Sequence, residues 1–237
     1  RQAIASRFKH VYNLHVDPES EILITGGSMQ AIYFAMQAIV NPGDEVIMAV
    51  PAFFFDIPVE LAGGKNVFVP LSYHNNFKHI EEEFDKKVNS KTKILLICSP
   101  HNPTGRVLTD GEIQGLVRVA KKHDLIIMHD QVYDGIVYDG AKHIPIMSLP
   151  DAEDRTISIQ SFSKKVNMVN YRLGYAVAPK EIIEQMELIL GYSSMGIPNF
   201  IQKAALPSLN KDWEVNHLRD LLGSLHKQRD YAVKRFN

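Results

Sequence analysis

The sequence predicts an α/β protein of three layers, α/β/α, with helices on both faces of a mostly parallel β-sheet. Two observations lead to this prediction. Seven short runs rich in Val and Ile are apolar on successive residues, which is typical of strands buried on both faces of a parallel sheet. Segments with helical periodicity separate several of these runs, and strands that alternate with helices indicate α/β architecture with right-handed crossovers.

The expected strands are short, and two of the segments between them have clear helical patterns. The strands comprise residues 21–25, 45–50, 66–71, 93–98, 125–129, 156–160 and 173–177. Residues 28–40 are apolar on almost every side, which predicts a helix packed beneath other structure. Residues 110–123 place apolar side chains at helical spacing along one face, and Asp110 is the expected N-cap of that helix.

Composition excludes several classes of protein. The 237 residues are 45% apolar and 22% charged, which is typical of a soluble globular chain and not of a disordered or fibrous one. Lys+Arg 26 balance Asp+Glu 27, so no basic field favours nucleic acid, and no apolar stretch approaches the roughly 20 residues of a membrane span. The lone cysteine, Cys98, cannot form an intramolecular disulfide and favours the cytoplasm.

Chemically distinctive residues follow five of the expected strands. Ligands of parallel α/β sheets bind at the carboxyl ends of the strands, so these residues are candidates for a site. The segments are Thr25-Gly26-Gly27-Ser28, Pro51-Ala52-Phe53-Phe54-Phe55, Ser99-Pro100-His101-Asn102-Pro103-Thr104-Gly105, Asp130-Gln131-Val132-Tyr133 and Ser161-Phe162-Ser163-Lys164. They supply a helix N-terminus, an aromatic ring, an amide, an acid with a phenol, and a lysine. This combination is what a phosphorylated aromatic cofactor requires.

Each of these segments also has an ordinary structural explanation. A Gly-Gly-Ser turn before a helix is commonly only a tight connection, and Asn-Pro-Thr-Gly is commonly only a turn. Phe53 to Phe55 suit core packing, and Lys164 beside Lys165 suits a solvated pair of cations. For each segment alone, the ordinary structural explanation is preferred. Only the order and spacing of all the segments together can distinguish a cofactor site from separate structural features.

In their order and spacing, the segments resemble the class I and II aminotransferases, pyridoxal-5′-phosphate-dependent enzymes of fold type I. Ser161-Phe162-Ser163-Lys164, with Arg172 eight positions later before Leu173-Gly174-Tyr175, is similar to the cofactor-lysine signature of that family. Asn102-Pro103-Thr104-Gly105 and Asp130-Gln131-Val132-Tyr133 resemble two further blocks in the same order. The resemblance covers roughly the whole chain. It implies that residues 1–237 are the cofactor-binding large domain of a longer chain, with 205–237 leading toward a small C-terminal domain.

The resemblance implies roles for eleven residues. Lys164 forms the Schiff base with the cofactor aldehyde and moves the substrate proton, Asp130 pairs with the pyridine nitrogen, and Tyr133 bonds the ring's phenolic oxygen. These three are the implied catalytic residues, and they also bind the cofactor. The other implied cofactor-binding residues are Gly27, Ser28 and Met29 at the phosphate, Phe53 on the ring face, Asn102 on the phenolic oxygen, and Ser161, Ser163 and Arg172 near the phosphate.

Two of the departures from the family pattern stand directly after the implied lysine and aspartate. Lys165 follows Lys164 where the family usually has a small or hydroxylated residue, and Gln131 stands where an acid frequently follows the aspartate. Neither change removes an implied cofactor contact. We therefore expect cofactor binding to survive, while the rate or the choice of substrate can differ.

The implied activity is the transfer of an amino group from an L-amino acid to a 2-oxo acid by a ping-pong route. The same cofactor residues serve β-lyases, cyclopropane-forming synthases and amino-acid oxidases, and the effector domain of a transcription regulator is a non-enzymatic alternative. We expect a homodimer, with residues 192–199 approaching the partner's site. The histidines show no ligand spacing with cysteines or paired carboxylates, so no metal is expected.

Overall fold

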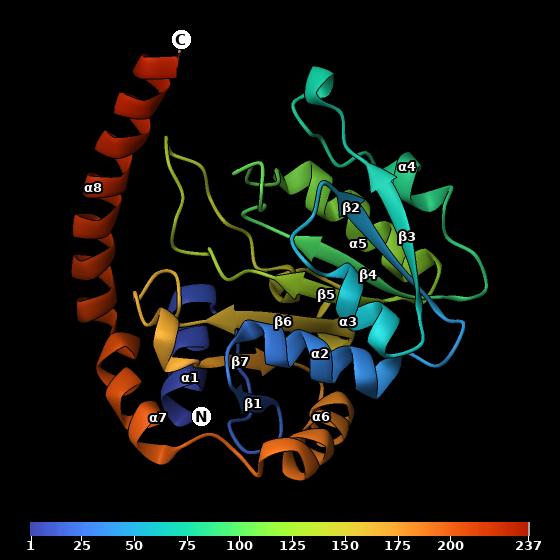
Figure 1. Ribbon diagram of the computed structural model, residues 1–237, viewed down its shortest axis with the longest axis horizontal. Coiled ribbons are helices and arrows are strands. Elements are labelled where there is room, and N and C mark those ends of the chain that lie inside the picture. Colours follow the sequence, from blue (N-terminus) through green and yellow to red (C-terminus); the bar gives the residue numbers. More distant parts are fainter. Residues whose placement is uncertain (237) are drawn as a thin grey trace.

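A seven-stranded sheet forms the centre of the protein, which we describe from a computed structural model over residues 1–236 (Figure 1). Its strand order is β1-β7-β6-β5-β4-β2-β3. The strands are β1 (Ile22–Thr25), β2 (Glu45–Val50), β3 (Lys65–Pro70), β4 (Thr92–Cys98), β5 (Ile126–Asp130), β6 (Thr156–Ser161) and β7 (Gly174–Val177). Each end lies within one residue of the end expected from the apolar runs.

Pairing is parallel throughout β3, β2, β4, β5 and β6, and antiparallel where β7 joins β6 and β1. The register pairs Cys98 with Asp130, and Asp130 with Ile159. The carboxyl ends of β4, β5 and β6 therefore meet at one edge of the sheet. The mostly parallel sheet expected from the sequence is confirmed.

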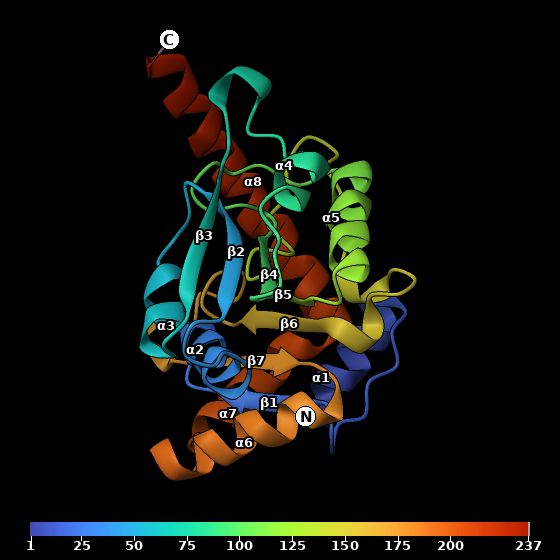
Figure 2. The ribbon, with the colours of Figure 1, turned by 90° about the vertical axis from the view of Figure 1, so that its right-hand side faces the viewer.

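Helices cover both faces of the sheet, which confirms the three-layer architecture. Leu96 of β4 packs into the core beneath α2 and α6, whereas its neighbour Leu95 packs into the core beneath α5. Figure 2 shows α2 and α5 on opposite sides of the strands. The helices are α1 (Gln2–Arg7), the π-helix η1 (Phe8–Tyr12), α2 (Ser28–Ile39), α3 (Asp56–Leu61), α4 (Glu81–Asp85), α5 (Asp110–Lys122), α6 (Lys180–Ser194), α7 (Asn199–Ala205) and α8 (Lys211–Phe236), with short 3₁₀ helices between some of them.

The N-cap of α5 is Thr109, so the expectation of Asp110 is wrong by one residue. Thr109 has extended backbone angles, and its hydroxyl oxygen accepts a hydrogen bond from the backbone N–H of Glu112 at 3.4 Å. The Glu112 carboxylate accepts the backbone N–H of Thr109 at 3.0 Å, which completes a capping box. Asp110 lies in the first turn, where its charge favours the positive end of the helix dipole.

The chain after Ala205 passes through the 3₁₀ helix η6 (Leu206–Leu209) into the long helix α8. The C-terminal half of α8 extends away from the sheet (Figure 1). Asn237, the last residue of the segment expected to lead toward a small domain, lies outside the described residues.

Two kinds of feature are absent from residues 1–236. No helix there combines the length and the apolar character that a membrane span requires. No group of three or more His, Cys, Asp or Glu side chains is placed there to hold a metal ion.

Gly174 allows β7 to approach the start of α2 closely. A β-carbon at Gly174 would lie 2.7 Å from the carbonyl carbon of Gly27 and 2.7 Å from the backbone nitrogen of Ser28. Both neighbours are backbone atoms, which cannot rotate away as a flexible side chain does. The absence of a side chain at Gly174 therefore sets how tightly the sheet packs against the α2 N-terminus.

We expect Gly174→Ala to lower the free energy of unfolding by about 1–3 kcal/mol, because the added methyl group must push backbone apart. Urea denaturation at pH 7 measures this change. Gly191→Ala in α6 is the matched control, since no atom lies within 4 Å of a β-carbon there and alanine favours a helix by about 1 kcal/mol. Equal stability of the two variants would contradict the packing argument.

Candidate functional site

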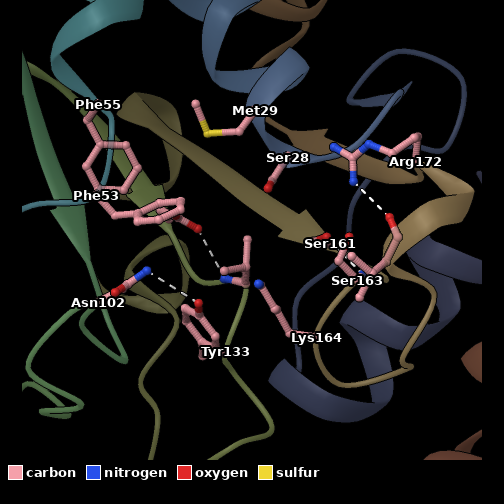
Figure 3. A pocket seen from close by; sticks show the side chains of 13 residues that line it. Ser28, Met29, Phe53, Phe55, Asn102, Tyr133, Ser161, Ser163, Lys164 and Arg172 are labelled. Carbon is pink, nitrogen blue, oxygen red and sulfur yellow. Dashed lines mark hydrogen bonds between the residues drawn. The ribbon is translucent and has the colours of Figure 1, made fainter.

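A cavity lies at the carboxyl edge of the sheet, where the segments after β1, β2, β4, β5 and β6 converge (Figure 3). Ten of the eleven residues singled out in the sequence line it, and the eleventh, Gly27, is the N-cap of α2 next to them. The lining residues are Ser28, Met29, Phe53, Phe55, Asn102, Asp130, Val132, Tyr133, Ser161, Ser163, Lys164, Val169 and Arg172. The fold thus brings together side chains from most of the length of the chain.

One end of the cavity is formed by the α2 N-terminus and Arg172. Gly27 has φ +95°, and a β-carbon there would lie 2.5 Å from a terminal nitrogen of Arg172, so the guanidinium lies directly against the helix start. Its Nη1 donates a hydrogen bond to the carbonyl oxygen of Val169 at 3.0 Å. Free backbone N–H groups, the helix dipole and a guanidinium all favour an anion. This end of the cavity is suited to a phosphate.

Ser161 and Ser163, at and just after the end of β6, lie beside this anion-binding end (Figure 3). Ser161 is the last residue of β6, and its hydroxyl oxygen accepts the backbone N–H of Ser163 at 3.0 Å. Both serines are buried. This local turn directs the chain toward Lys164, which is exposed to the cavity.

Asp130 presents a buried carboxylate at the end of β5. Its Oδ1 accepts a hydrogen bond from the backbone N–H of Val132 at 3.2 Å. Burial raises the pKa of the Asp130 carboxyl to about 7, and the Val132 N–H and the Lys164 ammonium offset only part of this effect. A cationic group bound in the cavity would stabilise the ionised form of this buried carboxyl and lower its pKa.

Lys164, Tyr133 and Asn102 lie together on another side of the cavity (Figure 3). The Lys164 ammonium is 5.8 Å from the centroid of the Tyr133 ring. The Asn102 side-chain amide donates to the Tyr133 hydroxyl at 3.5 Å, which follows from their positions after the neighbouring strands β4 and β5. Burial raises the pKa of the Tyr133 hydroxyl, and the nearby Asp130 carboxylate raises it further.

Three lining residues were not predicted: Phe55, Val132 and Val169. Phe55 belongs to the aromatic run after β2, and Val132 lies between Asp130 and Tyr133, so proximity to predicted residues is the signal that could have found them. Val169 has no such signal, because it reaches the cavity through the 3₁₀ turn that ends at Tyr171.

The two departures from the family pattern point away from the cavity. Lys165 is buried, and its ammonium lies 2.8 Å from Oδ1 of Asp134. Gln131 is also buried, where its amide bonds the Ser158 hydroxyl and its carbonyl oxygen accepts from His143 at 2.7 Å. The cavity therefore contains the amine of Lys164 and not that of Lys165.

Comparison with known proteins identifies the family. The family model for aminotransferase class I and II matches residues 1–237. The aspartate aminotransferase of Pyrococcus abyssi is 38% identical over 238 residues, a match that covers 100% of this chain and 61% of that protein. Aromatic-amino-acid aminotransferase 2 of Thermococcus litoralis is 36% identical over 238 residues, with the same coverage of 100% and 61%. The solved structure of an aromatic aminotransferase from Pyrococcus horikoshii has a TM-score of 0.96 at 36% identity, covering 100% of this chain and 63% of that one.

The chain belongs to the class I and II aminotransferases, and its fold is that of the fold type I enzymes. Members of this family depend on pyridoxal 5′-phosphate, which is therefore the cofactor to consider for the cavity. The chain spans 61% of the length of the first curated relatives that it matches.

The raised pKa of Asp130 predicts how the stability of the cofactor-free protein depends on pH. The folded protein binds the carboxyl proton more tightly than the unfolded chain, whose pKa is the ordinary 3.8. The stabilisation is therefore fully present below about pH 4 and is lost as the pH rises through about 7. It amounts to on the order of 4 kcal/mol at most, since each pKa unit corresponds to about 1.4 kcal/mol.

Asp130→Asn removes this titration while keeping the size of the side chain. We expect the unfolding free energy of the variant to fall less than that of the parent protein between pH 4 and pH 7. Urea denaturation of the cofactor-free proteins at stepped pH measures the difference. Asp220→Asn on the exposed face of α8 is the control and should follow the parent profile. Identical profiles for Asp130→Asn and the parent would contradict the assignment.

Proposed function

We propose that the protein transfers an amino group from an L-amino acid to a 2-oxo acid with pyridoxal 5′-phosphate, by a ping-pong route. The observation that carries this proposal is the convergence of three groups in one cavity: the Lys164 amine, the buried Asp130 carboxyl, and the anion-binding corner at Arg172. The amine can bond an aldehyde, the carboxyl can bond a ring nitrogen, and the cationic corner can bind a phosphate. Family membership over the whole chain supports the same activity.

The corner at the α2 N-terminus supports the assignment of the phosphate-binding residues. The space that any side chain at position 27 would fill is bounded by the Arg172 guanidinium, so the corner accepts an anionic group only because Gly27 has no side chain. Backbone N–H groups and hydroxyl groups supply further donors. In this proposal the phosphate is held by Gly27, Ser28, Met29, Ser161, Ser163 and Arg172.

The remaining lining residues would hold the ring. Asp130 would bond the ring nitrogen and keep it protonated, and the protonated nitrogen would be the cationic partner that the buried carboxyl lacks. Phe53 offers a ring face that is partly exposed at the cavity, while Asn102 and Tyr133 direct an amide and a hydroxyl to the phenolic oxygen. When bound, the cofactor supplies an electron-withdrawing ring that stabilises negative charge on the substrate's α-carbon.

Lys164 would do the chemical work of this chain. Its amine would hold the cofactor covalently until the substrate amine takes its place, and it would then move the proton from the substrate's α-carbon to the cofactor carbon that carried the aldehyde. The flexible stem and the place of Lys164 beside Tyr133 support both tasks, because one amine must reach two successive positions. Tyr133 would donate a hydrogen bond to the phenolic oxygen of the cofactor ring, and in this way it would tune the basicity of the Lys164 amine.

We also propose that residues 1–237 are the cofactor-binding large domain and that the whole protein is a homodimer. Tyr192, Met195 and Phe200 are 90%, 93% and 73% exposed, an arrangement of apolar side chains that favours burial against a second copy. Tyr192 and Met195 lie within residues 192–199, the segment expected to approach the partner's site, and Phe200 directly follows it. The helix α8 would lead from this domain toward the small domain. A cytoplasmic role in amino-acid metabolism is consistent with the lone cysteine, Cys98, which is buried.

A half-reaction screen tests the proposed activity. The protein loaded with pyridoxal 5′-phosphate is mixed with each amino acid in turn, with aspartate and the aromatic amino acids first because relatives are named for them. We expect the visible absorbance band to convert to that of pyridoxamine 5′-phosphate, with one equivalent of 2-oxo acid formed. The reverse half-reaction with a 2-oxo acid should restore the band.

Other outcomes of the screen would replace the proposal. Ammonia release with oxygen uptake would identify an oxidase, and ammonia release without it a β-lyase. A cyclic product would identify a synthase. Binding of amino acids without any turnover would favour the effector domain of a regulator.

A further inference from the structure

Four charged side chains form a buried ion cluster next to the cavity. Arg7 comes from the end of α1, Asp134 from the loop after β5, Lys165 from the loop after β6, and Glu214 from the first turn of α8. All four residues are buried, and none of them lines the cavity. We call these four residues the ion cluster.

Every cation of the ion cluster contacts both anions. The Arg7 guanidinium lies 2.8 Å from the Asp134 carboxylate and 2.6 Å from that of Glu214. The Lys165 ammonium lies 2.8 Å from Asp134 and 3.6 Å from Glu214. Two positive and two negative charges therefore balance, and removal of any one member leaves an uncompensated charge in the interior.

Two members of the ion cluster directly follow residues of the cavity in the chain. Lys165 follows Lys164, and Asp134 follows Tyr133. The Lys165–Asp134 ion pair therefore links the two loops that carry the cavity's amine and its phenol, one residue away from each. The Lys164 ammonium lies 5.8 Å from the centroid of the Tyr133 ring, and the neighbouring residues Lys165 and Asp134 are joined at 2.8 Å.

The helix α8 holds Lys165 by a second contact. The His217 Nε2 donates a hydrogen bond to the backbone carbonyl oxygen of Lys165 at 2.8 Å, and Glu214, three residues earlier in the helix, faces the Lys165 ammonium. Side chain and backbone of the residue after Lys164 are thus both fixed to one rigid element. On the other loop, the Tyr12 hydroxyl donates to Asp134 and accepts from the Gln160 amide at 3.1 Å.

An ion pair fixes the relative orientation of the two groups that it joins, which apolar packing does less strictly. Buried ion pairs are weak evidence for stability, because similar apolar side chains often fold as well or better. A short bond between one ammonium and one carboxylate instead fixes two backbones at a set distance and orientation. We therefore expect the ion cluster to fix the geometry of the neighbouring cavity more than to raise the free energy of unfolding.

We propose that Lys165 and Asp134 are positioning residues that set the place of the Lys164 amine relative to Tyr133 and the bound cofactor. This inference rests on the proposed function for its readout. The titratable groups that face Lys165 are Asp134, Glu214, Arg7 and His143 from the surrounding elements. Lys165→Met also removes one positive charge near Lys164, so a second variant that removes one charge of each sign separates a change in position from a change in charge.

Lys165→Met tests the proposal in the pyridoxal-5′-phosphate-loaded protein. We expect the pH midpoint of the visible absorbance band to shift by about half a unit or more, because the environment of the Lys164 amine changes. We also expect the single-turnover rate with an amino acid to fall about tenfold, with the concentration for half-saturation changing much less. Lys165→Arg should restore both, since a guanidinium can bond the same carboxylate. Lys121→Met, which breaks the exposed pair with Asp151, is the matched control and should behave as the parent protein.

A double variant keeps the test decisive if Lys165→Met does not fold. Lys165→Met with Asp134→Asn removes one charge of each sign and leaves the Arg7–Glu214 pair in place. A shifted midpoint in the folded double variant, whose net charge equals that of the parent protein, supports the proposal. A parent-like midpoint and rate in a folded, cofactor-loaded variant overturn it. A parent protein whose band does not respond to any amino acid instead contradicts the proposed function.

Discussion

The parallel register of β4, β5 and β6 is the constraint on which the site depends. Because Cys98 pairs with Asp130, and Asp130 pairs with Ile159, the three strands end at the same edge of the sheet. The turns that follow them then carry Asn102, Tyr133 and Lys164 into one cavity, although each belongs to a different crossover unit. A slip of one residue would turn the alternating side chains of a strand to the opposite face and separate these groups.

Charge is distributed around this edge according to what each group can bond. The Asp130 carboxyl is buried beside an open cavity, and its raised pKa records the absence of a strong cationic neighbour. The Asp134 carboxyl is equally buried, but the Lys165 ammonium and the Arg7 guanidinium outweigh burial and hold its pKa well below the usual range. Two aspartates four residues apart therefore differ in environment: the Asp130 carboxyl faces an open cavity, whereas the Asp134 carboxyl is paired with two cations.

Much of this arrangement could be predicted from the sequence, and the exceptions have physical reasons. Continuous apolar runs define buried strands closely, and the polar residues after them carry a chemical signature that indicates a site. Val132 and Val169 carry no such signature, since a valine in a cavity resembles a valine in the core. Thr109 and Asp110 are both good N-caps, and only the backbone angles decide between them. The contact between Arg7 and Glu214 joins residues at opposite ends of the chain, so no local pattern could reveal it.

We propose that Lys164, and no other amine within residues 1–236, serves the cofactor site. Borohydride reduction of the protein loaded with pyridoxal 5′-phosphate, followed by peptide mass spectrometry, tests it directly. The structure predicts a pyridoxyl mass on Lys164, because its amine lines the cavity while that of Lys165 is held by Asp134. A pyridoxyl mass on Lys165, or no labelled lysine in a protein that retains the cofactor, would contradict the account.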